Sequence, residues 1–208
     1  MALTARDKGG GDFQTIPADL HIGVCYAIWD IGTHFDQKFG KSIHKVIIGW
    51  ELPEVRGEFE RDGKKIDMPR TISKRYRLSL HKKADLRKDL ENWRGLPFTE
   101  TELKGFDVKK LLGVPCQIQV THKNGDDGKV YANISGIVKA PKGLPKPTLE
   151  TPQQFFSFEE TPVVIPPGTP TWIMDLIKQS DQYKGVTTDN GVSDDQEPPP
   201  IGDDDVPF

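Results

Sequence analysis

Polar and apolar positions in the N-terminal part of the chain follow the two-residue period of β-strands. In the stretch RTISKRYRLSLH, Ile72 and Tyr76 fall on one face, whereas Arg75 and Arg77 fall on the other. Two earlier stretches are rich in β-branched and aromatic residues, and the second of them stops at Pro53. We therefore predict three strands, over residues 20–32, 44–52 and 70–81.

The period then changes to that of a helix. In KKADLRKDLENWRG, the apolar residues Leu86, Leu90 and Trp93 follow an i, i+4, i+7 spacing, and Gly95 ends the run. This predicts a short amphipathic helix, with a second helical segment near 106–112. The strand pattern returns in two stretches that a glycine- and aspartate-rich turn, NGDDG, separates. They predict a β-hairpin over residues 114–123 and 129–139.

The order of these elements is three strands, a helix and two strands. It is the order of the OB-fold, a five-stranded barrel whose exposed sheet and loops bind oligonucleotides or oligosaccharides. We therefore predict a mainly β protein, with a five-stranded OB-fold barrel that carries a helix between strands 3 and 4. The barrel is expected over residues 19–147, after a flexible N-terminal arm at 1–18. Element order alone does not establish that the barrel closes.

The segment after the barrel predicts one more helix. Thr169 occupies an N-cap position and Pro170 the first helical position. An apolar stripe follows, formed by Trp172, Ile173, Leu176 and Ile177. We expect a C-terminal extension over 148–184 that carries this short helix at about 170–180, and then a disordered acidic tail over 185–208. The sequence leaves open whether residues 153–184 pack on the barrel.

Charge divides the chain in two. Residues 1–147 contain 26 Lys and Arg against 19 Asp and Glu, a net charge of +7, whereas residues 148–208 contain 2 against 12, a net charge of −10. A basic body with an acidic tail favours interaction with a polyanion, or partner binding through the tail. Hydrophobic residues make up only 35% of the chain, which fits a large part of it lying outside any core.

The strand pattern and the charge together predict a groove for single-stranded DNA, although an ordinary solvated surface would also be basic. Residues 64–94 hold eleven basic residues against four acids, which suits a groove that follows phosphates. Single-strand binding also needs flat side chains on which bases stack, each contributing roughly 1–3 kcal/mol. The candidate cations are Lys45, Lys74, Arg75, Arg77, Lys82 and Lys83. The candidate stacking residues are Trp29, Phe35, Phe39 and Tyr131.

Motifs of catalysis and metal binding are missing from the sequence. No G-x-x-x-x-G-K-[ST] phosphate loop, G-x-S-x-G elbow or H-E-x-x-H helix occurs, and the histidines are dispersed. Cys25 and Cys116 lie in apolar, strand-like stretches, so we interpret them as buried thiols. We expect no catalytic residue, no metal and no cofactor. Because no apolar run of about 18 residues occurs, we also expect a cytoplasmic protein without a membrane span.

Two sets of motifs resemble known single-stranded-DNA-binding proteins. The peptide D-D-D-V-P-F is similar to the acidic terminal peptide D-D-D-I-P-F of the bacterial single-stranded-DNA-binding proteins, with Val206 in the place of isoleucine. The barrel resembles instead a phage- or prophage-encoded OB-fold protein of the same type. The stretches that carry this second resemblance are VCYAIWDIGT, IIGWELP, WRGLPFTETEL and LLGVPCQIQVTH…YANISGIVKAPKG.

The resemblance implies that the barrel coats single-stranded DNA, while the tip recruits enzymes of replication, recombination or repair. In the family, the terminal phenylalanine enters an apolar pocket of the partner and its carboxylate meets a basic residue, a recognised mode of peptide capture. The residues that would carry these roles here are Asp203, Asp204, Asp205, Val206, Pro207 and Phe208. The bacterial proteins are usually tetramers, but this barrel has a longer helical insertion, so formation of a homo-oligomer stays open.

Three other functions stay open beside that of a non-enzymatic coating protein. A strand-annealing or recombination-mediator protein on the same fold would pair complementary strands rather than only coat them. A metal-dependent nuclease would cleave DNA with magnesium or manganese. A structural virion component would have no use for a basic groove.

Overall fold

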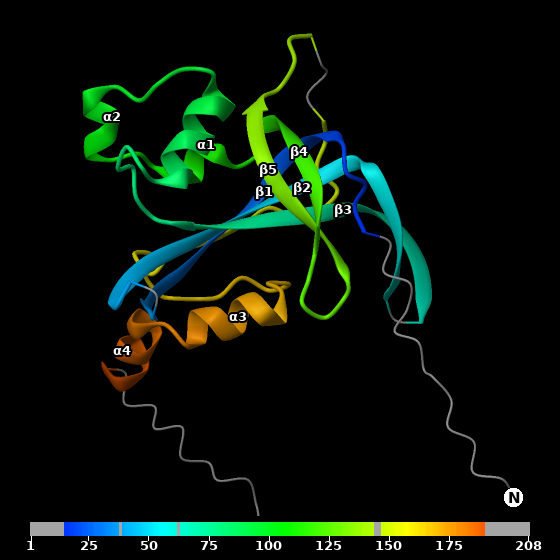
Figure 1. Cartoon of the computed structure of the whole chain (residues 1–208). Helices are drawn as coiled ribbons and strands as arrows, with labels where there is room; N and C mark the ends of the chain where they lie inside the picture. The colour runs from blue at the N-terminus through cyan, green and yellow to red at the C-terminus, as the bar shows by residue number, and fades with distance from the viewer. Residues whose placement is uncertain (1–14, 38, 62, 144–146, 190–208) are drawn as a thin grey trace, which may run out of the picture.

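The computed structural model describes residues 15–37, 39–61, 63–143 and 147–189 (Figure 1). The strands are β1 (Leu20–Asp36), β2 (Lys41–Arg61), β3 (Lys64–Arg77), β4 (Pro115–Asn124), β5 (Val130–Lys139) and β6 (Gln154–Phe156). The helices are α1 (Asp85–Arg94), α2 (Glu100–Lys104), the 3-10 helix η1 (Val108–Leu111), α3 (Thr171–Lys178) and α4 (Asp181–Asp189). The fold is thus mainly β, as predicted, with a few short helices.

Five strands form a sheet in the order β3-β2-β1-β4-β5, and all neighbours in it run antiparallel. The short β6 is a sixth strand, parallel to residues 27–29 of β1. It lies on the same edge of β1 as β4, which pairs with residues 20–24. β3 and β5 are the two end strands of this order. In the described residues no ladder joins these two strands, so the sheet is open between them.

The first three strands are longer than the sequence pattern predicts. β1 continues past Gly32 to Asp36, and β2 continues through Pro53 to Arg61. Pro53 lies at a register shift between Leu52 and Arg56, where the ladder to β3 is interrupted, and such irregular positions accommodate proline. β2 and β3 therefore continue as a two-stranded hairpin beyond the region that pairs with β1.

A first hydrophobic core lies between one face of the sheet and α1. The predicted helical stripe is confirmed, because Leu86, Leu90 and Trp93 are the buried residues of α1, and Gly95 ends the helix in the left-handed region. The ring of Trp93 packs against Trp50 of β2, with centroids 5.7 Å apart. The strands contribute Cys25, Ile28, Val46, Ile48, Cys116, Ile118, Ile134 and Ile137 to this core.

A second core lies on the opposite face of β1 and β2. Two β-bulges in β1, between Cys25 and Ala27 and between Asp30 and Gly32, change which residues point to each face. The second core consists of Tyr26, Ala27, Trp29, Ile31, Ile47, Phe156, Ile173 and Ile177. Because both faces are covered, every residue from 23 to 32 is buried.

The C-terminal extension packs on the sheet and supplies the cover of this second core. α3 lies along the strands (Figure 1) and buries Ile173 and Ile177. Its start differs from the prediction, because Pro170 is the N-cap residue and the hydroxyl of Thr169 donates to the carbonyl of Pro166 at 2.8 Å. Trp172, expected in the apolar stripe, is 50% exposed.

The segment after α3 forms a further helix, α4, where we expected disorder from residue 185 onward. Gln182 fixes this helix to β1: its Oε1 accepts from the Thr33 N–H at 2.7 Å, and its Nε2 donates to the Thr33 hydroxyl at 2.7 Å. Ser180 is fully buried against Gly32, which has a φ of 72° and where a Cβ would lie 2.5 Å from the Ser180 Cβ. This close fit is a tertiary contact that the local sequence does not reveal.

Candidate nucleic-acid interface

Predicted aromatic and basic side chains come together at the end of the β1–β2 hairpin. Lys45 and Arg77 lie opposite each other in the β2–β3 ladder. The guanidinium of Arg77 lies over the ring of Phe39, with Cζ 5.5 Å from the ring centroid. Phe39 is 56% exposed, and Phe35 of the same hairpin is 65% exposed. We call Phe39, Lys45 and Arg77 the hairpin-end cluster. Phe35 pairs with Ser42 and therefore lies on the face of His44, opposite the face of Lys45 and Arg77.

The cluster offers two chemistries that single-strand binding requires. The exposed ring of Phe39 provides a face on which a base can stack, and Arg77 provides a cation beside this ring. Lys45 contributes less free charge, because its ammonium lies 3.4 Å from the carboxylate of Asp36. Arg75 extends the basic surface, since it is exposed two residues before Arg77 and therefore points to the same face of β3.

Lys74 does not belong to this surface. Its ammonium donates to the carboxylate of Asp89 in α1 at 2.7 Å, and the hydroxyl of Tyr76 donates to the same oxygen at 2.8 Å. Burial and the charge of Asp89 raise the pKa of Tyr76 far above its usual value, so this hydroxyl stays a donor. Lys74 is thus held on the α1 side of β3 and is not available to phosphates in this arrangement.

Lys82 and Lys83 lie in the exposed segment between β3 and α1. The N–H of Lys83 donates to Nδ1 of His81 at 3.3 Å, which shapes a turn. Both lysines are exposed and follow Arg77 in the chain by five and six residues.

Trp29 is placed differently from the prediction. It is 1% exposed in the second core, where its indole N–H donates to Oε1 of Gln154 at 3.0 Å. Its ring packs edge-on against Tyr26, with centroids 5.8 Å apart. The extension that covers Trp29 is far away in sequence, which is why the strand pattern could not decide between core and surface. A base cannot stack on Trp29 in this arrangement.

Tyr131 lies apart from the hairpin-end cluster. It is half exposed in β5, opposite Lys123, and its hydroxyl donates to Asp127 at 2.6 Å. In Figure 1 the β4–β5 hairpin and the end of the β1–β2 hairpin lie on different sides of α3. Tyr131 is therefore a candidate stacking residue at a position separate from the hairpin-end cluster. The predicted partner-binding residues 203–208 lie outside the described residues.

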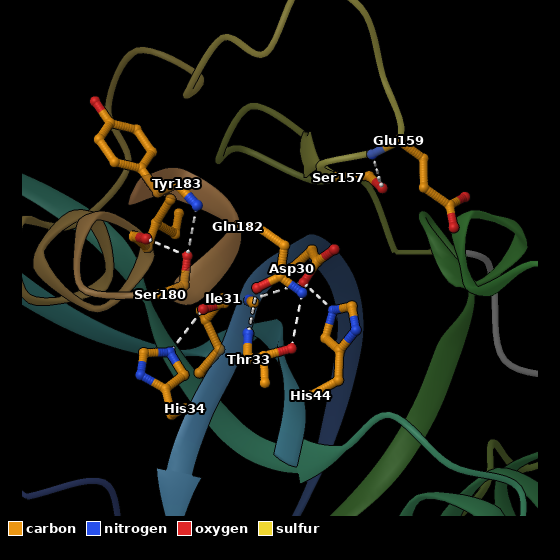
Figure 2. Close-up of polar contacts among 12 residues, drawn as sticks. Asp30, Ile31, Thr33, His34, His44, Ser157, Glu159, Ser180, Gln182 and Tyr183 are labelled. Atoms are coloured by element: carbon orange, nitrogen blue, oxygen red, sulfur yellow. Dashed lines mark hydrogen bonds and ion pairs between the residues drawn. The ribbon is translucent and has the colours of Figure 1, made fainter. Parts of the chain in front are cut away.

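Figure 2 shows a partly buried hydrogen bond between His44 of β2 and Asp30 of β1 that the sequence did not predict. Asp30 is 8% exposed. Its Oδ1 accepts hydrogen bonds from Nε2 of His44 at 2.6 Å and from the backbone N–H of Gly32 at 2.9 Å. The hydrogen bond to Asp30 raises the pKa of His44, and the charge of Glu159 adds to this. No sequence motif joins Asp30 to His44, because only the strand register brings them together.

The described residues contain little that points to catalysis. They hold no group of three or more His, Cys, Asp or Glu side chains that could bind a metal ion. Cys25 and Cys116 are buried, as predicted, and burial raises the pKa of Cys25 to about 12. A thiol with this pKa is a poor nucleophile near neutral pH. Across these same parts of the chain, every helix is too short or too polar to cross a membrane.

Comparison of the chain with protein-family models, with curated proteins and with solved structures finds no match. Its function is therefore inferred from its own residues and their arrangement.

Proposed function

We propose that this chain is a non-enzymatic protein that binds and coats single-stranded DNA. The observation that carries the proposal is the contact between the guanidinium of Arg77 and the exposed ring of Phe39. A cation beside an exposed stacking face is an element of sequence-tolerant single-strand binding. Arg75 extends this surface along β3, and Lys82 and Lys83 are exposed cations in the segment that follows β3.

The proposed architecture is that of an OB barrel. The strand order β3-β2-β1-β4-β5 and the position of α1 between β3 and β4 support it. In the proposed path, the strand follows the hairpin-end cluster and the outer face of β3. It does not cross the face of β1 that holds Trp29, because α3 covers that face.

The second part of the proposal concerns partners. Residues 203–208, DDDVPF, recruit enzymes of replication, recombination or repair through the phenylalanine and the acids. The support for this part is the sequence of the peptide and the acidic character of the segment that carries it.

The DNA proposal is tested by measuring the affinity for a labelled single-stranded oligonucleotide by fluorescence anisotropy, with duplex DNA for comparison. Phe39→Ala should weaken binding about tenfold, because one stacked base contributes roughly 1–3 kcal/mol. Arg77→Ala should also lower the slope of log affinity against log salt by about 0.7, the value for one phosphate of a single strand. We expect duplex DNA to bind less tightly than the single strand.

Phe59→Ala is the matched control, because Phe59 is another exposed phenylalanine, in the hairpin of β2 and β3 beyond β1. It should bind single strands as the unchanged protein does. Equal losses for Phe39→Ala and Phe59→Ala, or no loss for either, would show that the hairpin-end cluster is not the binding site.

A further inference from the structure

A cavity of about 310 Å³ lies on the face of β1 and β2 that carries Asp30, His44 and Val46. The opposite face of β2 carries Lys45, the ladder partner of Arg77, so the cavity and the hairpin-end cluster are separate surfaces. The segments that follow β3, begin η1 and follow β6 complete its walls. Its volume is at the small end of the range of ~300–1,000 Å³ for ligand sites, which suits a small molecule with one ring.

Most of the wall is apolar. Ile28, Val46 and Leu86 belong to the first core and form the buried part of the wall. Apolar and aromatic walls hold a flat ring through dispersion and stacking contacts. The cavity therefore suits a ligand with an apolar, planar part. The other apolar residues of the wall are Leu78, Leu80, Phe106, Val108, Phe155 and Phe156.

A buried carboxylate in the wall keeps one oxygen that the protein does not pair. Asp30 lines the cavity and is only 8% exposed, and both hydrogen bonds that it accepts, from His44 and Gly32, end on Oδ1. Its other oxygen, Oδ2, accepts no hydrogen bond from any residue of the described segments. Because a buried acceptor without a donor costs free energy, Oδ2 of Asp30 is the atom to which a ligand in the cavity would donate.

The exposed polar residues of the wall are acidic as well. Asp107 and Glu159 line the cavity and are exposed, and no lysine or arginine of the described residues lines it. Lys109 belongs to the adjacent η1, but its ammonium is paired with Glu160 at 2.7 Å. With the buried carboxylate, three acids surround a single imidazole, so the cavity stays negative even when this imidazole is protonated. Such a charge disfavours phosphate and favours a cation.

We propose that this cavity binds a small organic cation in which a flat aromatic ring carries a cationic N–H group. The ring packs against the apolar wall, the N–H group donates to Oδ2 of Asp30, and Glu159 adds attraction from the exposed side. An amidinium or guanidinium suits this role best, because its planar donors match the geometry of a carboxylate. DNA binding is not required for this site, because it lies on another face and its charge favours a cation over phosphate.

The probe is benzamidine, which joins one flat ring to an amidinium, and its neutral counterpart of nearly the same shape is benzamide. Isothermal titration calorimetry measures the affinity of the full chain for each at one pH and one salt concentration. Two-dimensional proton–nitrogen NMR locates the bound probe through shifts of backbone N–H signals. The cavity variants are Asp30→Asn, which removes the buried charge with little change in shape, and Glu159→Gln. The matched control is Glu100→Gln, since Glu100 is another exposed glutamate, in α2, and does not line the cavity.

We expect benzamidine to bind about tenfold more tightly than benzamide, as a hydrogen bond to a charged group allows. Asp30→Asn should weaken the binding of benzamidine about tenfold. Glu159→Gln should weaken it about threefold, because an exposed charge is screened by water and salt. Glu100→Gln should bind as the unchanged protein does. The shifted signals should include those of Val108 and Ser157, which line the cavity.

Four outcomes would overturn the proposal: no binding of benzamidine, equal affinities for benzamidine and benzamide, shifts confined to the acidic residues 190–208, or unchanged affinity in both cavity variants. Thermal unfolding followed by circular dichroism shows whether Asp30→Asn still folds. If it does not, the comparison of Glu159→Gln with Glu100→Gln and the location of the shifts decide the question.

Discussion

At the scale of single residues, neighbours in the fold decide which predicted DNA contacts are available. Lys74 shares the two-residue period of Ile72 and Tyr76, so its direction toward the inner face can be read from the sequence. The contact of Lys74 with Asp89 cannot be read from the sequence, because it depends on how α1 packs against β3. Arg77 is an odd number of residues from Ile72 and Tyr76, so it points to the other face of β3, where its guanidinium lies over the ring of Phe39. Alternation in a strand thus separates structural lysines from surface cations only in part.

The pair of Asp30 and His44 gives a prediction about pH. The hydrogen bond that His44 donates to Asp30 raises the pKa of His44 above its ordinary value of about 6.5, so the folded chain binds the proton more tightly than the unfolded chain. The resulting stabilisation is complete below the unfolded pKa and is lost as the pH rises through the folded pKa. His44→Gln should therefore lower the free energy of unfolding more at pH 6 than at pH 8.5.

Urea unfolding of the unchanged protein and of His44→Gln at both pH values measures this difference. A loss of the same size at both would mean that protonated His44 and Asp30 do not stabilise the fold.

At the scale of elements, segments with a strong local pattern were predicted well and those that depend on distant partners were not. The stripe of α1 and the hairpin of β4 and β5 were evident from period and turn residues. The helix α2 also had a local signal, the capping box between Thr99 and Glu102, which the prediction overlooked. β6 and α4 have none, because β6 forms on an edge of β1 and α4 forms where Gln182 meets Thr33.

The two faces of α3 differ enough to be tested by one pair of substitutions. Ile177→Ala removes a fully buried side chain from the second core and should lower the free energy of unfolding by about 2–5 kcal/mol. Trp172→Ala changes the half-exposed face and should cost less than about 1 kcal/mol. Urea unfolding of both variants provides the comparison.

A result in which Trp172→Ala is the more destabilising change would contradict the packing of α3 described above. The unchanged protein is the reference, and equal m-values would show that the variants unfold from the same compact state.

At the scale of the whole molecule, the packed structure continues beyond the basic residues 1–147 into the acidic segment that follows them. Glu51 is fully buried in β2, and its carboxylate accepts from the backbone N–H groups of Glu150 at 3.0 Å and Thr151 at 2.6 Å. These bonds hold the segment that leads to β6 and α3. Composition predicted an extension but could not show that it covers Trp29, because that contact joins residues more than a hundred positions apart.

Two shortened chains test this organisation. A chain that ends at residue 189 should unfold at the temperature of the full protein and bind single strands equally or more tightly, because residues 190–208 contain six Asp and Glu and no Lys or Arg. It should also lose co-purification with enzymes of replication or repair. A chain that ends at residue 147 should aggregate, since it exposes Trp29, Ile31 and Ile47.

Thermal unfolding followed by circular dichroism, light scattering and anisotropy with labelled DNA measure these outcomes. A stable, monodisperse chain of 147 residues would contradict the role of the extension as part of the core.

The shared edge of β1 also has a consequence for how the chain is made. β4 pairs with its first residues, and β6 pairs with Ala27–Trp29 on the same edge. During synthesis, residues 27–29 on this edge and one apolar face of β1 therefore stay uncovered after β2 and β4 have emerged, until Gln154 and then α3 leave the ribosome. A nascent chain in this state exposes strand edge and apolar surface that other chains can bind. Completion of β1 thus awaits a segment that lies more than a hundred residues later in the chain.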